Sequence, residues 1–392
     1  MANTQMAPAG KGAGAAPAAP QPLPWRAGTQ PSDIQDFQPP AVTLGANTQQ
    51  LPVYHPTADS FQRGVWIQAV GTYPSNAVAT IAFKQDGPFN VINTISFTDT
   101  QQRFIFGPCG GFDLYCVNLL GGYFFQNDPK ASAAYSAPLT STPTGFQFAL
   151  YLPLEIDARD GLGSLENKNQ ASTFNLNVTV ETSTNVYTTP PTNPASVKFT
   201  FTSDSYLQPA ATDAQGNPLA QSPQALGTTQ FWNKSNFQIN SGNNPNVYLN
   251  GGVGFPIRNI VLEAYDVSSG LRNTGETNWA SPLTVTYKGV TLFNRNKVIW
   301  QEKMARAYGL TTIGAGVAEP ANSKPAGVYS LPFNLDFTNA PGAELRNGYL
   351  QTVPGTQILA TGSWAASTTL FELVNYVAPA NGNPGSIRAG GR

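Results

Sequence analysis

Apolar and polar side chains alternate strictly along several segments that follow the first fifty residues. In residues 172–181, the apolar side chains Phe174, Leu176, Val178 and Val180 are separated by asparagine and threonine. A period of two predicts a β-strand with one buried and one solvent-facing side. Residues 196–203 and 282–288 have the same period, and a more continuous apolar character predicts more deeply buried strands over residues 64–70, 91–99, 146–152 and 257–265.

Clusters of turn-forming residues separate these segments. Residues 84–88, 188–194 and 240–246 are rich in glycine, proline, asparagine and aspartate, which favour tight turns. Many short strands joined by such turns predict an all-β protein built from sandwiches or barrels.

One segment, residues 296–309, has a helical period instead. Glu302 and Arg306 are spaced to pair on one turn of a helix, and Gly309 marks its end. Neighbouring basic side chains predict a solvated or subunit-facing surface rather than a nucleic-acid site. The apolar stripe of this helix is Trp300, Met304 and Tyr308, and the basic residues are Arg295, Lys297, Lys303 and Arg306.

A short motif occurs twice, 179 residues apart (331 − 152 = 179). Its pattern is Leu-Pro-apolar-x-aliphatic-Asp, which fits a strand whose end is marked by an aspartate that bonds backbone N–H groups or caps a short helix. We interpret it as a structural repeat, so the two copies predict two eight-stranded jelly-roll barrels in tandem, with few short helices. The copies are Leu152, Pro153, Ile156 and Asp157, and Leu331, Pro332, Leu335 and Asp336.

Several carboxylates near the first copy suggest other chemistry. A glycosidase pair or a calcium loop needs convergent carboxylates, but Arg159 stands where a calcium loop needs an oxygen ligand. In the second copy Asn334 replaces Glu155. We therefore expect no catalytic residues, no metal site and no cofactor. The carboxylates considered are Glu155, Asp157, Asp160 and Glu166.

Cysteine, histidine and overall charge narrow the function further. Cys109 and Cys116 are expected to be buried free thiols, with a local disulfide as the alternative, and His55 is the only histidine. This composition disfavours zinc sites and catalytic triads. Charged residues make up 11% of the chain and the net charge is −1, which provides no bulk basic surface for nucleic acid.

The first 48 residues differ in composition from the rest. They are rich in alanine and proline and predict a flexible arm, for which Trp25 and Arg26 are the candidate anchors. No apolar run is long enough to span a membrane and no signal-peptide pattern is present, so we expect the protein to stay where it is made. The expected divisions are the arm (1–48), a first jelly roll (49–207), a linker or long loop (208–230), a second jelly roll (231–378) and a flexible tail (379–392).

The strand order and several short matches resemble a known family. The segment from "RGVWIQAVGTYPSN" through "FKQDGPFNVINTISFTDTQQ", together with "FALYLPLEIDARDGLGSLENKNQASTFNLNVTV", is similar to the first barrel of the double jelly-roll major capsid proteins of tectivirus-type, membrane-containing phages. "AGVYSLPFNLDF" and "TLFELVN" are similar to the end of the second barrel. The resemblance covers residues 50–378.

The resemblance implies a structural protein of the virion without enzymatic activity, assembled in the host cytoplasm. It implies a homotrimer with a pseudo-hexagonal outline that tiles an icosahedral shell around an internal membrane. The implied partners are neighbouring trimers and penton and minor capsid proteins, with no direct sequence-specific binding to nucleic acid, and the internal viral membrane is a further candidate for contact. A glycan-binding spike or lectin-like β-sandwich protein is the alternative, followed by a carbohydrate-active β-sandwich enzyme.

Overall fold

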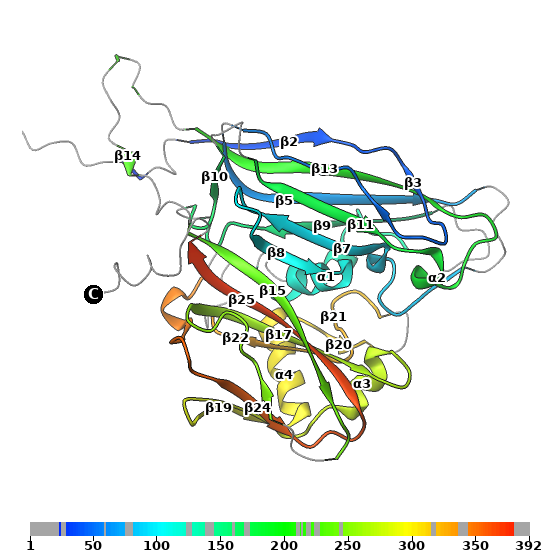
Figure 1. Cartoon of the computed structure of the whole chain (residues 1–392), viewed down its shortest axis with the longest axis vertical. Coiled ribbons are helices and arrows are strands. Elements are labelled where there is room, and N and C mark those ends of the chain that lie inside the picture. Colours follow the sequence, from blue (N-terminus) through cyan, green and yellow to red (C-terminus); the bar gives the residue numbers. More distant parts are fainter. Residues whose placement is uncertain are drawn as a thin grey trace, which may run out of the picture.

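The structure, a computed structural model, consists of two jelly-roll barrels that follow one another along the chain (Figure 1). Each barrel contains two facing sheets, and apolar side chains from both sheets fill its interior. The described residues are 23–24, 29–58, 60–74, 81–122, 128–137, 145–158, 161–167, 173–208, 212, 215–216, 221–222, 228–242, 246–314, 319–335 and 344–379.

In the first barrel, strand β5 is central to one sheet. It pairs with β9 and β10 along one edge and with β13 along the other, and β13 then pairs with β2 and β3. The facing sheet has the order β8-β7-β11-β4. The strands are β2 (Pro31–Phe37), β3 (Val42–Thr43), β4 (Gln49–Gln50), β5 (Ser60–Thr72), β7 (Ile92–Thr98), β8 (Phe104–Cys109), β9 (Gly145–Pro153), β10 (Leu165–Asn167), β11 (Asn175–Val180) and β13 (Ser196–Leu207).

The second barrel repeats this arrangement. One sheet has the order β22-β17-β25-β15, with β23 also on β17, and the facing sheet has the order β16-β24-β18-β19. Each strand of these sheets has a counterpart in the first barrel at the same place in the order. The strands are β15 (Thr228–Ile239), β16 (Val247–Tyr248), β17 (Pro256–Asp266), β18 (Leu283–Tyr287), β19 (Val290–Arg295), β22 (Val328–Pro332), β23 (Leu350–Gln351), β24 (Ile358–Gly362) and β25 (Thr368–Pro379).

Short elements complete the described part of the chain. The paired short strands are β1 (Leu23–Pro24) with β14 (Gln221–Ser222), β6 (Ala82–Phe83) with β12 (Tyr187–Thr189), and β20 (Thr312–Ile313) with β21 (Ser323–Lys324). The helices are α1 (Gly111–Leu120), α2 (Ser183–Val186), α3 (Arg272–Asn278) and α4 (Lys297–Tyr308), with 3-10 turns η2 (Phe89–Val91), η3 (Pro129–Ala131) and η4 (Arg346–Gly348).

The alternating pattern correctly predicts which side chains are buried. In β13, Val197, Phe199 and Phe201 enter the core, whereas Lys198 is exposed. The predicted helix is confirmed as α4: its apolar stripe is buried, Arg306 Nε lies 2.8 Å from Glu302 Oε1, and Gly309 ends it in the left-handed conformation.

The two barrels share a sheet and a helix. In the described part of the chain, β15 of the second barrel meets β8 of the first at Trp232 and Phe106, which joins one sheet of each barrel into a continuous nine-stranded sheet. Helix α1 leaves β8 and lies between the barrels (Figure 1). All ten of its residues are buried.

The expected boundary at residue 48 is wrong. Residues 31–37 and 42–43 form β2 and β3, which pair with β13 and therefore belong to the first barrel. Phe37 stacks on Tyr54 in that core, with ring centroids 5.5 Å apart. The second barrel begins at Thr228, three residues before the expected start. The candidate anchors Trp25 and Arg26, and residues 380–392 of the expected tail, lie outside the described residues.

Candidate functional site at the junction of the two barrels

An arginine occupies a β-bulge in the first barrel. The register between β5 and β13 shifts at Asp204, and Arg63 is the extra residue. The Arg63 carbonyl accepts the N–H groups of Leu154 and Glu155 at 2.9 and 2.8 Å. Its guanidinium Nε lies 2.9 Å from Glu155 Oε2, and Nη1 lies 2.9 Å from Asp204 Oδ1. Arg63 therefore fixes the chain just beyond the end of β9.

The second barrel also has an arginine at a β-bulge. Arg258 is the extra residue of a bulge between β17 and β25, and its carbonyl accepts the N–H of Phe333 at 3.0 Å. Its guanidinium binds both oxygens of Glu344, at 2.6 and 2.9 Å, and Nη1 lies 2.9 Å from Asn375 Oδ1. This two-point geometry is the strong form of an arginine–carboxylate pair.

The bulge arginines lie beside the motif that occurs twice in the sequence. Leu152 and Pro153 end β9, and Leu331 and Pro332 end β22. These strands occupy corresponding places in their sheets, so each motif copy meets the bulge arginine of its own barrel.

The remaining motif positions behave differently from one another. Ile156 is buried, and Leu335 is partly buried against the core. Asp157 Oδ2 lies 2.7 Å from Arg346 Nη2, so this aspartate bridges the two barrels, a role that the expectation of a cap did not include. Asp336 lies outside the described residues.

Neither bulge arginine was predicted from the sequence. Arg63 and Arg258 each stand near the start of a strand and are followed by one residue and then by valine or isoleucine. That weak signal, at an offset of 195 residues (258 − 63 = 195), could have identified them as a pair.

Burial shifts the pKa of a carboxyl group beside Arg63, and tyrosine hydroxyls bind the glutamates of both clusters. Burial raises the pKa of Asp204 to about 6, against the opposing effect of the Arg63 charge. Tyr206 donates its hydroxyl to Glu155 Oε1 at 2.5 Å, and in the second barrel Tyr349 donates to Glu344 Oε1 at 2.6 Å. Each carboxylate is thus held by an arginine and a tyrosine.

Residues of β15 connect the two arginine clusters. Gln230 Nε2 donates to the Glu155 carbonyl at 2.8 Å, and Gln230 Oε1 accepts from Asn375 Nδ2 at 3.0 Å. Thr229 Oγ1 donates toward the carbonyls of Leu154 and Gly163. Because these bonds are buried and directional, they constrain how one barrel is oriented relative to the other.

Helix α1 binds both barrels through polar groups. The Asn118 side chain accepts the Tyr151 N–H at 2.8 Å and donates to the Tyr151 carbonyl at 2.6 Å, so it completes the edge of β9. Asn259 of the second barrel donates to the Leu120 carbonyl at 2.9 Å.

Ion pairs surround the N-terminal half of α1. Lys234 Nζ lies 2.7 Å from Asp113 Oδ2, and Arg272 Nε lies 2.7 Å from Asp86 Oδ1. Glu263 is fully buried nearby, and neither of its carboxyl oxygens has a hydrogen-bond partner among the described residues. Burial, and next the Asp113 charge, raise the pKa of Glu263 well above its usual value.

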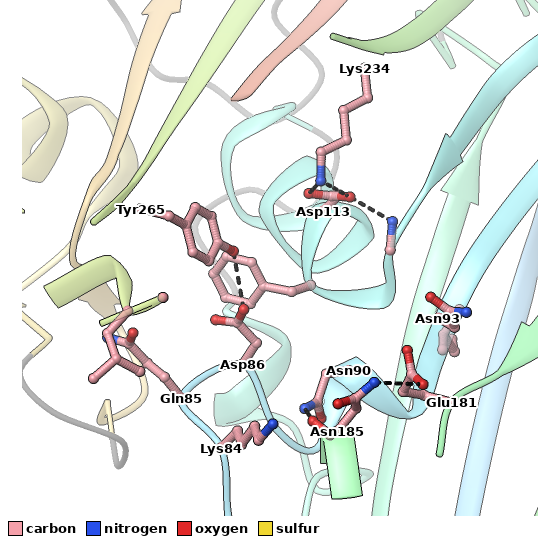
Figure 2. Close-up of a pocket in the computed structure, with 15 residues that line it drawn as sticks. Lys84, Gln85, Asp86, Asn90, Asn93, Asp113, Glu181, Asn185, Lys234 and Tyr265 are labelled. Atoms are coloured by element: carbon pink, nitrogen blue, oxygen red, sulfur yellow. Dashed lines mark hydrogen bonds and ion pairs between the residues drawn. The ribbon is translucent and has the colours of Figure 1, made fainter. Parts of the chain in front are cut away.

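A polar pocket of about 290 Å³ opens beside this cluster (Figure 2). Its carboxylates are engaged in structural bonds: Asp113 with Lys234, Asp86 with Tyr265, and Glu181 with Asn185. A glycosidase needs two carboxylates facing one another across a cleft. The bonding of these acids does not provide that arrangement.

The other candidate groups have structural positions. Glu155 is held by Arg63, Glu166 lies opposite Phe61 in the β10–β5 pair, and Asp160 lies outside the described residues. Cys109 and Cys116 are buried free thiols, as predicted, and burial raises the pKa of both. His55 is exposed, with Nδ1 3.4 Å from the carbonyl of Phe174.

Two kinds of feature are absent from the described residues. They include no group of three or more histidine, cysteine, aspartate or glutamate side chains placed to hold a metal ion. No described helix combines the length and apolar character that crossing a membrane requires.

Comparison with known proteins identifies the fold. No protein-family model and no curated protein matches the sequence. The crystal structure of the STIV MCP has a TM-score of 0.59 at 13% identity, covering 90% of this chain and 97% of that one. A chain in the atomic structure of Sulfolobus turreted icosahedral virus has a TM-score of 0.57 at 12% identity, covering 90% and 91%.

A third structure, the major capsid protein P2 of bacteriophage PM2, has a TM-score of 0.49 at 9% identity, covering 90% of this chain and all (100%) of that one. The first two similarities establish that this chain has the double jelly-roll fold of viral major capsid proteins. The predicted all-β tandem architecture is confirmed.

Proposed function

We propose that this protein is a viral major capsid protein with no enzymatic activity. The observation that carries the proposal is the extent of the fold match: 90% of this chain corresponds to 97% of the STIV MCP, including both barrels. A lectin or enzyme that used a single sandwich would not require the second barrel or the bonded junction between the two.

The proposed assembly is a homotrimer of pseudo-hexagonal outline. Two barrels per chain give six similar units in three chains, and trimers of that shape tile an icosahedral shell. The internal membrane, the phage host type, and contacts with penton and minor capsid proteins are parts of the same proposal, supported by the sequence resemblance to tectivirus-type capsid proteins. The protein would then be located in the virion after assembly in the host cytoplasm.

We also propose that the two barrels are copies of one building block. The support is the matched backbone bonding at the motif: the Arg63 carbonyl accepts the N–H that follows Pro153, and the Arg258 carbonyl accepts the N–H that follows Pro332. Each guanidinium also pairs with a buried glutamate, which lies within the motif in the first barrel and beyond it in the second. A rigid link between the copies suits a shell protein, because each trimer must present six barrels in a fixed arrangement.

The test is the native mass of the purified full-length chain, measured by light scattering at micromolar concentration, followed by electron microscopy of particles assembled from it. A trimer of about 125 kDa (three chains of 41.6 kDa) that forms shells is expected. A persistent monomer that binds a glycan array would instead support the lectin-like alternative, and hydrolysis of an oligosaccharide would support the enzyme.

A further inference from the structure

Helices α1 and α4 occupy corresponding positions in the two barrels. Each follows the last strand of a hairpin after one capping residue, Gly110 or Asn296. Each also bonds the edge of the next strand. Asn118 bonds both backbone groups of Tyr151 in β9, whereas Met304 Sδ accepts the N–H of Ser330 in β22. The caps and the bonding residues are both 186 residues apart (296 − 110 and 304 − 118), so the two helices align without a gap.

The face of α1 that packs on the second barrel contains Phe112, Asp113, Cys116 and Leu120. The Arg272 guanidinium carbon lies 3.8 Å from the Phe112 ring centre, Lys234 pairs with Asp113, and Asn259 donates to the Leu120 carbonyl. All four residues are buried.

The corresponding residues of α4 are Val298, Ile299, Glu302 and Arg306, and all four are exposed. Val298 and Ile299 expose 68% and 51% of their surface, and the side chains of Glu302 and Arg306 expose 55% and 80%. The same helical face is therefore covered in the first barrel and uncovered in the second. Val298 and Ile299 therefore form an exposed apolar pair on the uncovered face of α4.

Strand β15, which covers α1, corresponds to strand β2 of the first barrel, and β2 is uncovered. The two strands correspond because β15 pairs with β25 as β2 pairs with β13. Asn375 of β25 corresponds to Asp204 of β13, because each bonds the bulge arginine of its own barrel. In that alignment Gln35 of β2 corresponds to Lys234 of β15. Yet β15 meets β8, whereas β2 ends its sheet in the described part of the chain, with Asp33, Ile34, Gln35 and Asp36 exposed.

We propose that the α4 face and the edge of β19 around Leu292, the counterpart of Phe106, dock on the β2 edge of a second copy of this chain. The contact would reproduce between chains the one that α1 and β8 make with β15 within a chain. The proposal deepens the proposed trimer, on which it rests, by assigning its interface.

Charge on the two surfaces supports this pairing. Because Glu302 and Arg306 pair with one another, the α4 side contributes an excess of positive charge from Lys297 and Lys303, whereas the β2 side contributes Asp33 and Asp36. Opposite charges around an apolar centre favour the correct partner and register. The two surfaces differ from one another, so the contact is head-to-tail and generates a ring when its rotation closes.

The experiment uses Ile299→Asp in the full-length chain, with Gln35→Lys as the second change. Ile299 corresponds to Asp113, which accepts the N–H of its own capping residue Gly110 at 2.5 Å, so aspartate at this position of the helix suits the fold. The matched control is Val290→Asp in β19. Val290 is 65% exposed, and its counterpart Phe104 stays 47% exposed within the chain, which places Val290 outside the docked area.

Trimer dissociation is followed by sedimentation velocity in a dilution and urea series. Ile299→Asp should raise the dissociation constant roughly tenfold or more, as expected for a central interface residue. Val290→Asp should leave it unchanged. Adding Gln35→Lys to Ile299→Asp should restore most of the affinity, because it recreates between chains the Asp113–Lys234 pair.

Each of the other outcomes contradicts a defined part of the proposal. A wild-type trimer that Ile299→Asp does not weaken would overturn the docking of α4 and leave the capsid proposal standing. Weakening without rescue by Gln35→Lys would overturn the assignment of β2 as the partner surface. A wild-type chain that stays monomeric would overturn the trimer itself.

Discussion

Replacing Arg258 by methionine tests whether the buried ion pair of the bulge arginine with Glu344 stabilises the second barrel. The side chain is 1% exposed, and its hydrogen bonds include two to Glu344 and one to Asn375. Methionine preserves much of the packing volume but removes the charge and the donors of these bonds. Glu344 is itself only 8% exposed, so the change leaves a buried carboxylate without its cation.

Removing one partner of a buried ion pair destabilises a protein by about 3–5 kcal/mol. We expect Arg258→Met to lower the free energy of unfolding by that amount. The double variant Arg258→Met with Glu344→Gln leaves no unpaired charge and should recover about 2 kcal/mol of the loss. Lys198→Met is the control for losing a surface charge on a strand, and its effect should stay within about 0.5 kcal/mol.

Urea unfolding followed by tryptophan fluorescence suits this test, with all variants at one protein concentration. The signal reports mainly on the second barrel, which contains Trp232, Trp279, Trp300 and Trp364. A loss below about 1 kcal/mol for Arg258→Met would refute the idea that the bulge arginine holds the barrel end. A double variant as unstable as the single one would show that the unpaired charge is not the cause.

Three further outcomes are expected. Asn118→Leu removes both bonds to the Tyr151 backbone and should cost about 2–4 kcal/mol in the same urea assay, and no loss would contradict the role of Asn118 in completing the edge of β9. Burial raises the pKa of Glu372 from 4.5 to about 7, so the folded state binds its proton more tightly than the unfolded chain does, and stability should fall as pH rises between those values and stay level above them. Glu372→Gln should remove this contribution and be more stable than wild type at pH 8 by about 3 kcal/mol. Urea midpoints of both proteins are measured at pH 5 and pH 8, and the same pH-dependent change in wild type and variant would refute the assignment. Deleting residues 2–48 removes β2 and should lower the melting temperature, whereas deleting residues 2–28 should not, and equal melting temperatures would show that β2 adds nothing to the barrel.

The alternating strands could be predicted from sequence because each has one wet face. In β11 and β13 the solvent-facing positions carry polar side chains, so the period of two is visible. The same reasoning explains the success with α4, whose outer face is exposed. Periodicity identifies an element only where part of its surface meets water.

The elements that were missed lack that contrast. Helix α1 is buried on every side, so its sequence has no polar stripe to reveal a helical period. Strand β2 is the opposite case, since most of its side chains are exposed at a sheet edge and its composition resembles that of a flexible arm. Pairing with β13 defines it, and no local pattern encodes that pairing.

The candidate site was predicted only in part for a related reason. The doubled motif marked the ends of β9 and β22, because the residues of each copy are consecutive in the chain. Its partners Arg63 and Arg258 come from other strands, 92 residues before Glu155 and 86 before Glu344. Contacts across such separations depend on sheet register, which the sequence of one strand does not specify.

The corresponding faces of α1 and α4 carry different side chains, and the difference fits the way in which each face is covered. Within a chain, α1 is always against the second barrel, so that contact can contain charges such as Asp113 and Lys234 that are never left unpaired. In the proposed assembly, the α4 face is exposed to water in the free chain and becomes buried only when it docks on another copy. There α4 carries Ile299 at the position of Asp113, and its charges Glu302 and Arg306 already pair with one another at the surface. Burying Ile299 on assembly releases apolar surface from water without desolvating a lone charge. In the proposed assembly, this single replacement of a charged residue by an apolar one, Asp113 in α1 by Ile299 in α4, is what suits the α4 face to a contact that forms only when chains meet.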